Sequence, residues 1–277
     1  MKNQTLYISD LDGTLLNRNS TVSPHSIEKI NRLLQKGMLF TIATARTPAT
    51  VVPLLEQLQI DIPAVLMNGA VLYDIRRKLY IRTNGFTDNS ALRYIDLLEK
   101  RGLIPFVYRI DNNKLKVFHK PLTNNMQREF KRQRENTPYK EFIPTIDYSV
   151  ELLDNPPLFL MVIDRFDKLQ IAAAEINRTG KCSLFCYRDV VDLEYGYLEI
   201  YPKGVSKAAT AQQIIDKLTP WEVVAFGDNL NDMPLFKIAD RRYAPENAVN
   251  EVKQQATAII ADNDHDGVAL FLEKDFL

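Results

Sequence analysis

The feature that most constrains the fold is an alternation of short apolar runs with amphipathic segments near the start of the chain. Apolar runs at residues 5–9, 38–44 and 63–68 are separated by helix-like segments at residues 23–37 and 47–59. A continuous apolar run is typical of a strand buried on both faces, and strands that alternate with helices form parallel sheets covered by helices. We therefore expect an α/β fold with a parallel sheet.

The same alternation returns near the end of the chain, whereas the middle lacks it. The returning strand-like runs are residues 197–202, 221–228 and 257–262. Residues 84–190 contain helix and strand candidates without a regular order. We expect one α/β domain in two parts, residues 1–83 and 191–277, interrupted by an inserted α/β domain at residues 84–190.

Charge and composition exclude several classes of function. The chain has 277 residues, with 35 Lys and Arg balanced by 35 Asp and Glu, so it lacks the positive field that nucleic-acid binding needs. No uncharged apolar run is long enough for a membrane span, and Asp10 and Asp12 interrupt any secretory signal. Cys182 and Cys186 are expected to be free thiols. We expect a cytoplasmic protein without nucleic-acid or membrane partners; its oligomeric state is not indicated.

Polar residues that could bind a ligand or take part in catalysis follow the expected strands of the first domain. Ligands of an open parallel sheet bind at the carboxyl ends of its strands, so residues far apart in the sequence can meet there. The candidates are Asp10, Leu11, Asp12, Thr44, Ala45, Lys207, Asp228, Asn231 and Asp232. Taken singly, each has a plain explanation as a turn, a helix cap or a solvated residue.

Together these residue types suit phosphoryl transfer. Clustered carboxylates repel one another unless a cation lies among them, and oxygen ligands favour Mg²⁺. Lys207, Thr44 and backbone N–H groups could hold a phosphoryl group. A carboxylate such as Asp10 can attack phosphorus, while an acid two residues later, Asp12, can protonate the leaving oxygen.

The sequence resembles the haloacid dehalogenase superfamily, and within it the Cof-type phosphatases of subclass IIB. The resemblance implies a Rossmann-like core with an inserted α/β cap of the IIB type. It also implies a Mg²⁺-dependent phosphatase of small phosphomonoesters, with sugar phosphates as the first substrate class. The segments that carry it are residues 10–16, 43–46, 67–74, 197–207, 227–232 and 262–269.

The resemblance also implies a role for each candidate residue. Asp10 is the expected nucleophile and a metal ligand, and Asp12 the general acid and base, with its backbone carbonyl on the metal. Asp228 and Asp232 complete the metal side. The phosphate-binding positions are Leu11, Thr44, Ala45, Lys207 and Asn231.

Some features leave alternatives open. Ala45 stands where the related proteins commonly have Gly, and its amide serves only if the backbone does not demand a positive φ. A phosphosugar mutase or phosphotransferase, or a non-catalytic phospho-acceptor, could use the same site. In the inserted domain, Tyr108, Arg109 and the basic cluster at residues 128–134 are possible substrate selectors, although a solvated helix face also explains the cluster.

Overall fold

The computed structural model describes residues 4–152, 155–189 and 191–277, which form two compact units. The first unit comprises the chain up to Arg82 together with Ser206–Leu277. The second comprises Thr83–Val205 and is therefore inserted into the first. None of the helices in the described ranges is long and apolar enough to cross a bilayer.

The first unit is built on a five-stranded parallel sheet, as the alternation of the sequence predicts. Its order is β14-β13-β12-β1-β2, which places β1 between β12 and β2. The strands are β1 (Thr5–Ser9), β2 (Leu39–Ile42), β12 (Glu222–Phe226), β13 (Arg241–Pro245) and β14 (Ala258–Ile260). The parallel α/β prediction is confirmed.

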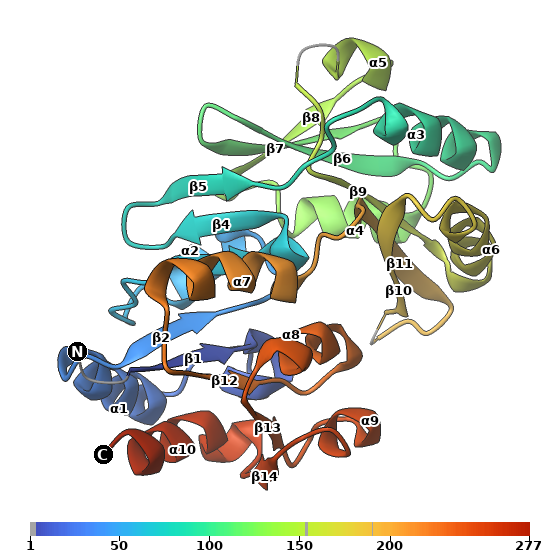
Figure 1. Ribbon diagram of the computed structural model, residues 1–277. Helices are drawn as coiled ribbons and strands as arrows, with labels where there is room; N and C mark the ends of the chain where they lie inside the picture. Colours follow the sequence, from blue (N-terminus) through green and yellow to red (C-terminus); the bar gives the residue numbers. More distant parts are fainter. Residues whose placement is uncertain (1–3, 153–154, 190) are drawn as a thin grey trace. The chain divides into compact units, whose positions relative to one another are not determined.

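Helices cover both faces of this sheet (Figure 1). Leu6 and Ile8 of β1 face a core to which α7 and α8 contribute, whereas Tyr7 points the other way and donates a hydrogen bond to Asp275 of α10, 2.8 Å away. Ser23 caps the first of these helices, since its side chain accepts from the Ser26 N–H. The helices are α1 (Pro24–Gln35), α2 (Pro48–Leu54), α7 (Lys207–Leu218), α8 (Met233–Ile238), α9 (Asn250–Lys253) and α10 (Gly267–Phe276).

A second, three-stranded sheet of order β3-β4-β5 extends from the end of β2 through a parallel bridge between Ala43 and Val65. Only β3 lies in a strand expected from the sequence. Four tight helical turns link the strands and helices of this unit. The strands are β3 (Ala64–Leu66), β4 (Val71–Asp74) and β5 (Leu79–Thr83), and the turns are η1 (Leu11–Leu15), η2 (Met67–Gly69), η3 (Leu230–Asp232) and η4 (Asn263–His265).

The second unit contains a six-stranded sheet of order β10-β11-β9-β6-β7-β8, antiparallel except for the pair β7–β8. Its strands are β6 (Pro105–Asp111), β7 (Lys114–His119), β8 (Lys140–Pro144), β9 (Phe159–Arg165), β10 (Cys182–Arg188) and β11 (Tyr195–Pro202). Its helices are α3 (Ser90–Lys100), α4 (Asn125–Arg132), α5 (Tyr148–Glu151) and α6 (Phe166–Asn177).

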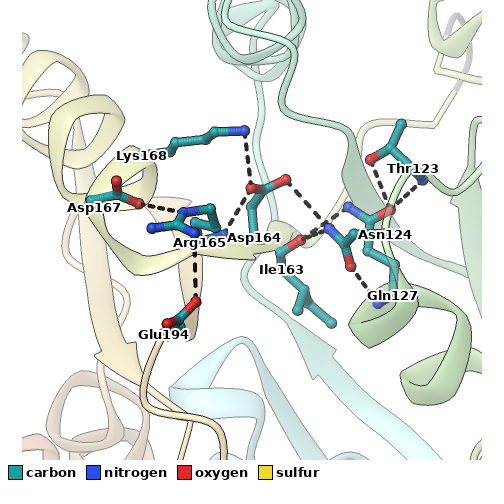
Figure 2. A network of polar contacts seen from close by, with 9 residues as sticks. All are labelled: Thr123, Asn124, Gln127, Ile163, Asp164, Arg165, Asp167, Lys168 and Glu194. Carbon is teal, nitrogen blue, oxygen red and sulfur yellow. Dashed lines mark hydrogen bonds and ion pairs between the residues drawn. The ribbon is translucent and has the colours of Figure 1, made fainter.

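The two faces of this sheet have different coverings. Val107, Leu160 and Leu198 pack in one apolar core with residues of α3 and α6. Because side chains alternate along a strand, Tyr108 and Phe159 lie on the opposite face, which we call the second face. Helix α4 packs on this face, and the side chains of Asn124 and Gln127 tie it to the carbonyl of Ile163 at the end of β9 (Figure 2).

The return from the second unit differs from the sequence-based boundary. We expected residues 191–277 to belong to the first domain, but β11 pairs antiparallel with both β9 and β10 and so belongs to the second unit. Leu198 and Ile200 are completely buried, which gives β11 the apolar look of a core strand. Sequence alone does not distinguish the two sheets at this position. The two cysteines, on β10, are free and half-buried as expected.

Candidate active site

The end of β1 delivers the first two acids of the site. Asp10 follows Ser9 directly, and its N–H donates to the carbonyl of Phe226 at the end of β12. The chain then turns through Gly13, which has a φ of +72°. A Cβ at Gly13 would lie 2.5 Å from Oδ2 of Asp228, so the glycine allows the β1 and β12 ends to approach each other.

The ends of β1, β2 and β12 enclose a cavity of about 280 Å³. This is the edge of the sheet at which the sequence predicted that distant polar residues would meet. Six of the nine predicted residues line the cavity, Lys207 bonds to Asp10, and Asp232 bonds to Lys207. The lining consists of Asp10, Asp12, Gly13, Thr44, Ala45, Asp228, Asn229 and Asn231.

Lys207 enters this group from the first residue of α7. Its Nζ lies 2.7 Å from Oδ1 of Asp10 and 2.7 Å from Oδ1 of Asp232. The Lys207 side chain is 1% exposed, and both carboxylates are buried as well. Lys203, four residues earlier in the sequence, is exposed and lies in the second unit. Lys207 is therefore the cation that neutralises the buried acids of the site.

A close contact between backbones fixes the start of α7. The Ser206 side chain accepts from the Ala209 N–H and so caps the helix. The hydroxyl of Thr210 donates to the carbonyl of Gly69, 2.7 Å away. A Cβ at Gly69, whose φ is +96°, would lie 2.1 Å from the carbonyl oxygen of Ser206. Because Gly69 has no side chain, η2 packs closely against the first turn of α7, and this contact helps to position Lys207.

Burial and mutual repulsion shift the ionisation of these groups. Burial, followed by the charge of Asp232, raises the pKa of Asp10 well above its usual value, although Lys207 opposes the shift. Burial and the Asp232 charge also raise the pKa of Asp228 to about 6. Burial alone would lower the pKa of Lys207, but its two carboxylate partners outweigh that effect and raise it. The site therefore holds an excess of buried negative charge.

The donor set fits a small, hard cation. Asp10, Asp228 and Asp232 each offer a carboxylate oxygen, and these oxygens lie within 4.8 Å of one another. One lysine cannot neutralise three carboxylates, so a divalent cation would relieve the remaining repulsion. An all-oxygen set is what Mg²⁺ prefers. Asp232 has structural bonds too, because its Oδ2 accepts from the N–H groups of Asp228 and Asn229.

Asp12 lines the same cavity but is not a member of this carboxylate group, and it pairs with Arg46. The Nε and Nη2 of Arg46 lie 2.8 and 2.5 Å from the two carboxylate oxygens of Asp12. The Asp12 side chain is 52% exposed, so it can reorient at modest cost. We gave Arg46 no role from the sequence; its place at the end of β2, opposite Asp12, was the available signal.

Of the remaining phosphate-binding candidates, Thr44, Ala45 and Asn231 line the cavity, whereas Leu11 is not part of its lining. Thr44 is buried at the end of β2, and its hydroxyl accepts from the Arg46 N–H. Ala45 is not among the described residues with positive φ, so alanine fits where related proteins commonly have glycine. Leu11 begins the turn after Asp10, with its side chain completely buried.

Known proteins match this chain over nearly its whole length. The family model of haloacid dehalogenase-like hydrolases matches residues 7–272. The 5-amino-6-(5-phospho-D-ribitylamino)uracil phosphatase YwtE of Bacillus subtilis is 31% identical over 284 residues, covering 96% of each chain. The pyridoxal phosphate phosphatase YbhA of Escherichia coli is 28% identical, covering 95% of each chain.

Solved structures share the fold. A sugar phosphatase of haloacid dehalogenase subclass IIB superimposes with a TM-score of 0.75 at 19% identity, covering 98% of both chains. At this identity the likeness concerns the fold, including the inserted α/β unit.

Proposed function

Because the chain belongs to the haloacid dehalogenase-like hydrolase family, we propose that it is a Mg²⁺-dependent phosphatase of small phosphomonoesters that works through an aspartyl-phosphate on Asp10. The observation that carries this proposal is the buried carboxylate group of Asp10, Asp228 and Asp232 with Lys207 between two of its members. That group borders a cavity large enough for a phosphoryl group.

Asp10 is the nucleophile in this proposal. Its carboxylate is fixed by Lys207 and borders the cavity, so it can face a phosphorus atom without first being ordered. Its attack forms a bond between a carboxylate oxygen and phosphorus as the bond from phosphorus to the leaving oxygen breaks. Lys207 stabilises the charge that develops on the phosphoryl oxygens.

Asp12 handles the protons. In its protonated form it donates to the leaving oxygen, which departs as an alcohol. The resulting carboxylate then takes a proton from a water molecule, whose oxygen attacks phosphorus and releases phosphate from Asp10. This role requires a carboxylate that can move, and the exposed, Arg46-paired side chain of Asp12 satisfies that need.

Mg²⁺, when bound, neutralises the carboxylates and the phosphoryl oxygens during transfer. Asp10, Asp228 and Asp232 would hold it with side-chain oxygens, and Asp12 with its backbone carbonyl. The hydroxyl of Thr44, the N–H groups of Leu11 and Ala45, and the Asn231 side chain would orient the phosphoryl group. Sugar phosphates are the first substrate class to test, as the family resemblance implies. The two relatives are named for chemically different phosphomonoesters, so their names do not select one substrate.

Phosphate release from a panel of phosphomonoesters, with Mg²⁺ and with a chelator, tests the proposal. We expect hydrolysis only with the metal, and its loss in Asp10→Asn. The matched control is Asp61→Asn, which removes an exposed carboxylate paired with Arg76 in the same unit. Hydrolysis that survives in Asp10→Asn would refute the nucleophile, and isomerised sugar phosphate as the product would indicate a mutase.

A further inference from the structure

Two asparagines from the C-terminal part of the chain bind the turn that follows Asp10. Nδ2 of Asn247, in the loop after β13, donates to the carbonyl of Gly13, 2.7 Å away. Nδ2 of Asn263, in η4, donates to the carbonyl of Leu16, also 2.7 Å away. The N–H of Asn263 donates to Oδ1 of Asn247 at 3.2 Å, so the two residues form one connected group, which we call the asparagine brace.

Both segments that carry the brace are anchored to the first unit. The N–H of Val249 donates to the carbonyl of Asp228, 3.0 Å away, and so fixes the loop after β13 next to the end of β12. Oδ1 of Asp266, which follows η4, accepts hydrogen bonds from the hydroxyls of Ser23 and Ser26 at the start of α1. The brace can therefore restrain the turn instead of moving with it.

The turn needs such outside bonds because its central residue is a glycine. Gly13 has a φ of +72°, and a Cβ there would lie 2.5 Å from Oδ2 of Asp228, so a residue with a stiffer backbone does not fit. The hydroxyl of Thr14 donates to Oδ1 of Asp228 at 2.8 Å, which ties the turn to the end of β12. The brace adds ties to the segments that follow β13 and β14.

Asp12 is the residue whose place depends on this turn. It directly precedes Gly13, so the orientation of the Gly13 peptide sets where the Asp12 side chain begins. The Asp12 side chain is 52% exposed, and its ion pair with Arg46 is of the exposed kind that contributes little. The backbone must therefore supply most of the accuracy, and a displacement of about 1 Å in a catalytic group can cost about 100-fold in rate.

We propose that Asn247 and Asn263 are positioning residues, which hold the turn so that Asp12 reaches the leaving oxygen. The inference rests on the proposed phosphatase function, in which Asp12 is the acid and base. The two residues act through the carbonyls of Gly13 and Leu16 and not on the substrate, since neither belongs to the lining described for the cavity of about 280 Å³.

Dependence on the leaving group tests this role. The p-nitrophenolate of p-nitrophenyl phosphate departs without a proton, whereas the alkoxide of glycerol 2-phosphate must take one from Asp12. In Asn247→Ala, we expect kcat/KM for glycerol 2-phosphate to fall by roughly 10- to 100-fold and that for p-nitrophenyl phosphate by less than about threefold. A smaller folded fraction would lower both values equally, so their ratio isolates positioning. Asp12→Asn, which removes the acid itself, should shift the ratio further in the same direction.

Asn31 of α1 provides the matched control. Its Nδ2 donates to the carbonyl of Gln57 at 2.8 Å, and its Oδ1 accepts from the N–H of Gln59 at 2.9 Å. Asn31→Ala therefore removes bonds of the same kind as Asn247→Ala, and both variants should melt about 2–4 °C lower than the wild type. Only Asn247→Ala should change the ratio of the two kcat/KM values. A ratio in Asn247→Ala that equals the wild-type ratio would overturn the positioning role.

Hydrogen exchange separates this inference from the proposed function, because it needs no turnover. In the full-length protein without Mg²⁺, the peptide that spans residues 10–17 should exchange about tenfold faster in Asn247→Ala and at the wild-type rate in Asn31→Ala. Unchanged exchange in Asn247→Ala would overturn the brace even if the protein is a phosphatase. Faster exchange supports the brace even if neither compound is hydrolysed, and in that case the proposed function alone has failed.

Discussion

Replacing Lys207 by methionine should destabilise the first unit severely. The methionine preserves most of the apolar volume but removes the charge that bonds to Asp10 and Asp232 at 2.7 Å each. The side chains of Lys207 and its two partners are all less than 10% exposed, so solvent cannot take over the lost interactions. The variant therefore leaves buried carboxylates without their counter-charge.

The size of the effect follows from this burial. Breaking a buried ion pair by removing one partner costs about 3–5 kcal/mol, because the remaining charge is uncompensated. The loss should be largest at neutral pH, where Asp228, whose pKa is raised to about 6, is still ionised. It should shrink as the pH falls through about 6, the value to which the pKa of Asp228 is raised, because protonation removes the repelling charges. Added Mg²⁺ should restore part of the stability through the same carboxylates.

Urea unfolding of the full chain, followed by circular dichroism with a chelator present, measures the change. Lys203→Met is the matched control, because it removes an exposed lysine four residues earlier and should change the free energy of unfolding by less than about 0.5 kcal/mol. Equal stabilities of the two variants would refute the argument. So would a loss in Lys207→Met that grows, rather than shrinks, below pH 6.

Three further predictions follow from named contacts. Asp12→Asn should lower kcat by about 10²–10⁴-fold while changing stability by less than about 1 kcal/mol, because among the described residues its side chain pairs with Arg46 alone, in a half-exposed pair. Steady-state kinetics and urea unfolding check both. Gly69→Ala should lower both stability and kcat, since the added Cβ would lie 2.1 Å from the Ser206 carbonyl oxygen. The control Gly37→Ala, with a similar φ and no atom within 4 Å of the added Cβ, should lower the free energy of unfolding by about 1–3 kcal/mol less. Lys140→Met should stabilise the protein most below about pH 7, where the buried Lys140 is charged in both the folded and the unfolded chain, and the gain should fade toward pH 10.5, where the lysine is neutral in both. A gain in the free energy of unfolding that does not depend on pH would contradict the buried charge.

The sequence predicts most strongly those elements whose burial is uniform. The apolar runs at β1, β2 and β12 become adjacent parallel strands, and Ser23 and Ser206 cap the helices that follow them. Strands β5 and β8 lie at the edges of their sheets and carry charged and exposed residues, so their sequences have no apolar pattern from which a strand could be predicted. The place of β11 depends on its pairing partners, which a single sequence does not reveal.

The candidate site follows the same division. That Asp10, Thr44 and Asp228 meet at one sheet edge follows from their positions at the ends of parallel strands. The pairing of Arg46 with Asp12, and the close approach of Gly69 to α7, depend on contacts between segments far apart in the sequence. The burial of Lys140 is likewise invisible in a strand that begins after a polar loop.

The most direct test of the central claim is a search for phosphate on Asp10. In Asp12→Asn, p-nitrophenyl phosphate should still phosphorylate Asp10, because its leaving group departs without a proton, whereas hydrolysis of the aspartyl-phosphate lacks its base. With Mg²⁺ present, we predict a burst of p-nitrophenol equal to the enzyme concentration and the mass of one phosphoryl group on the peptide that contains Asp10. Turnover without a burst, together with an unmodified Asp10 peptide after rapid acid quenching, would contradict the account.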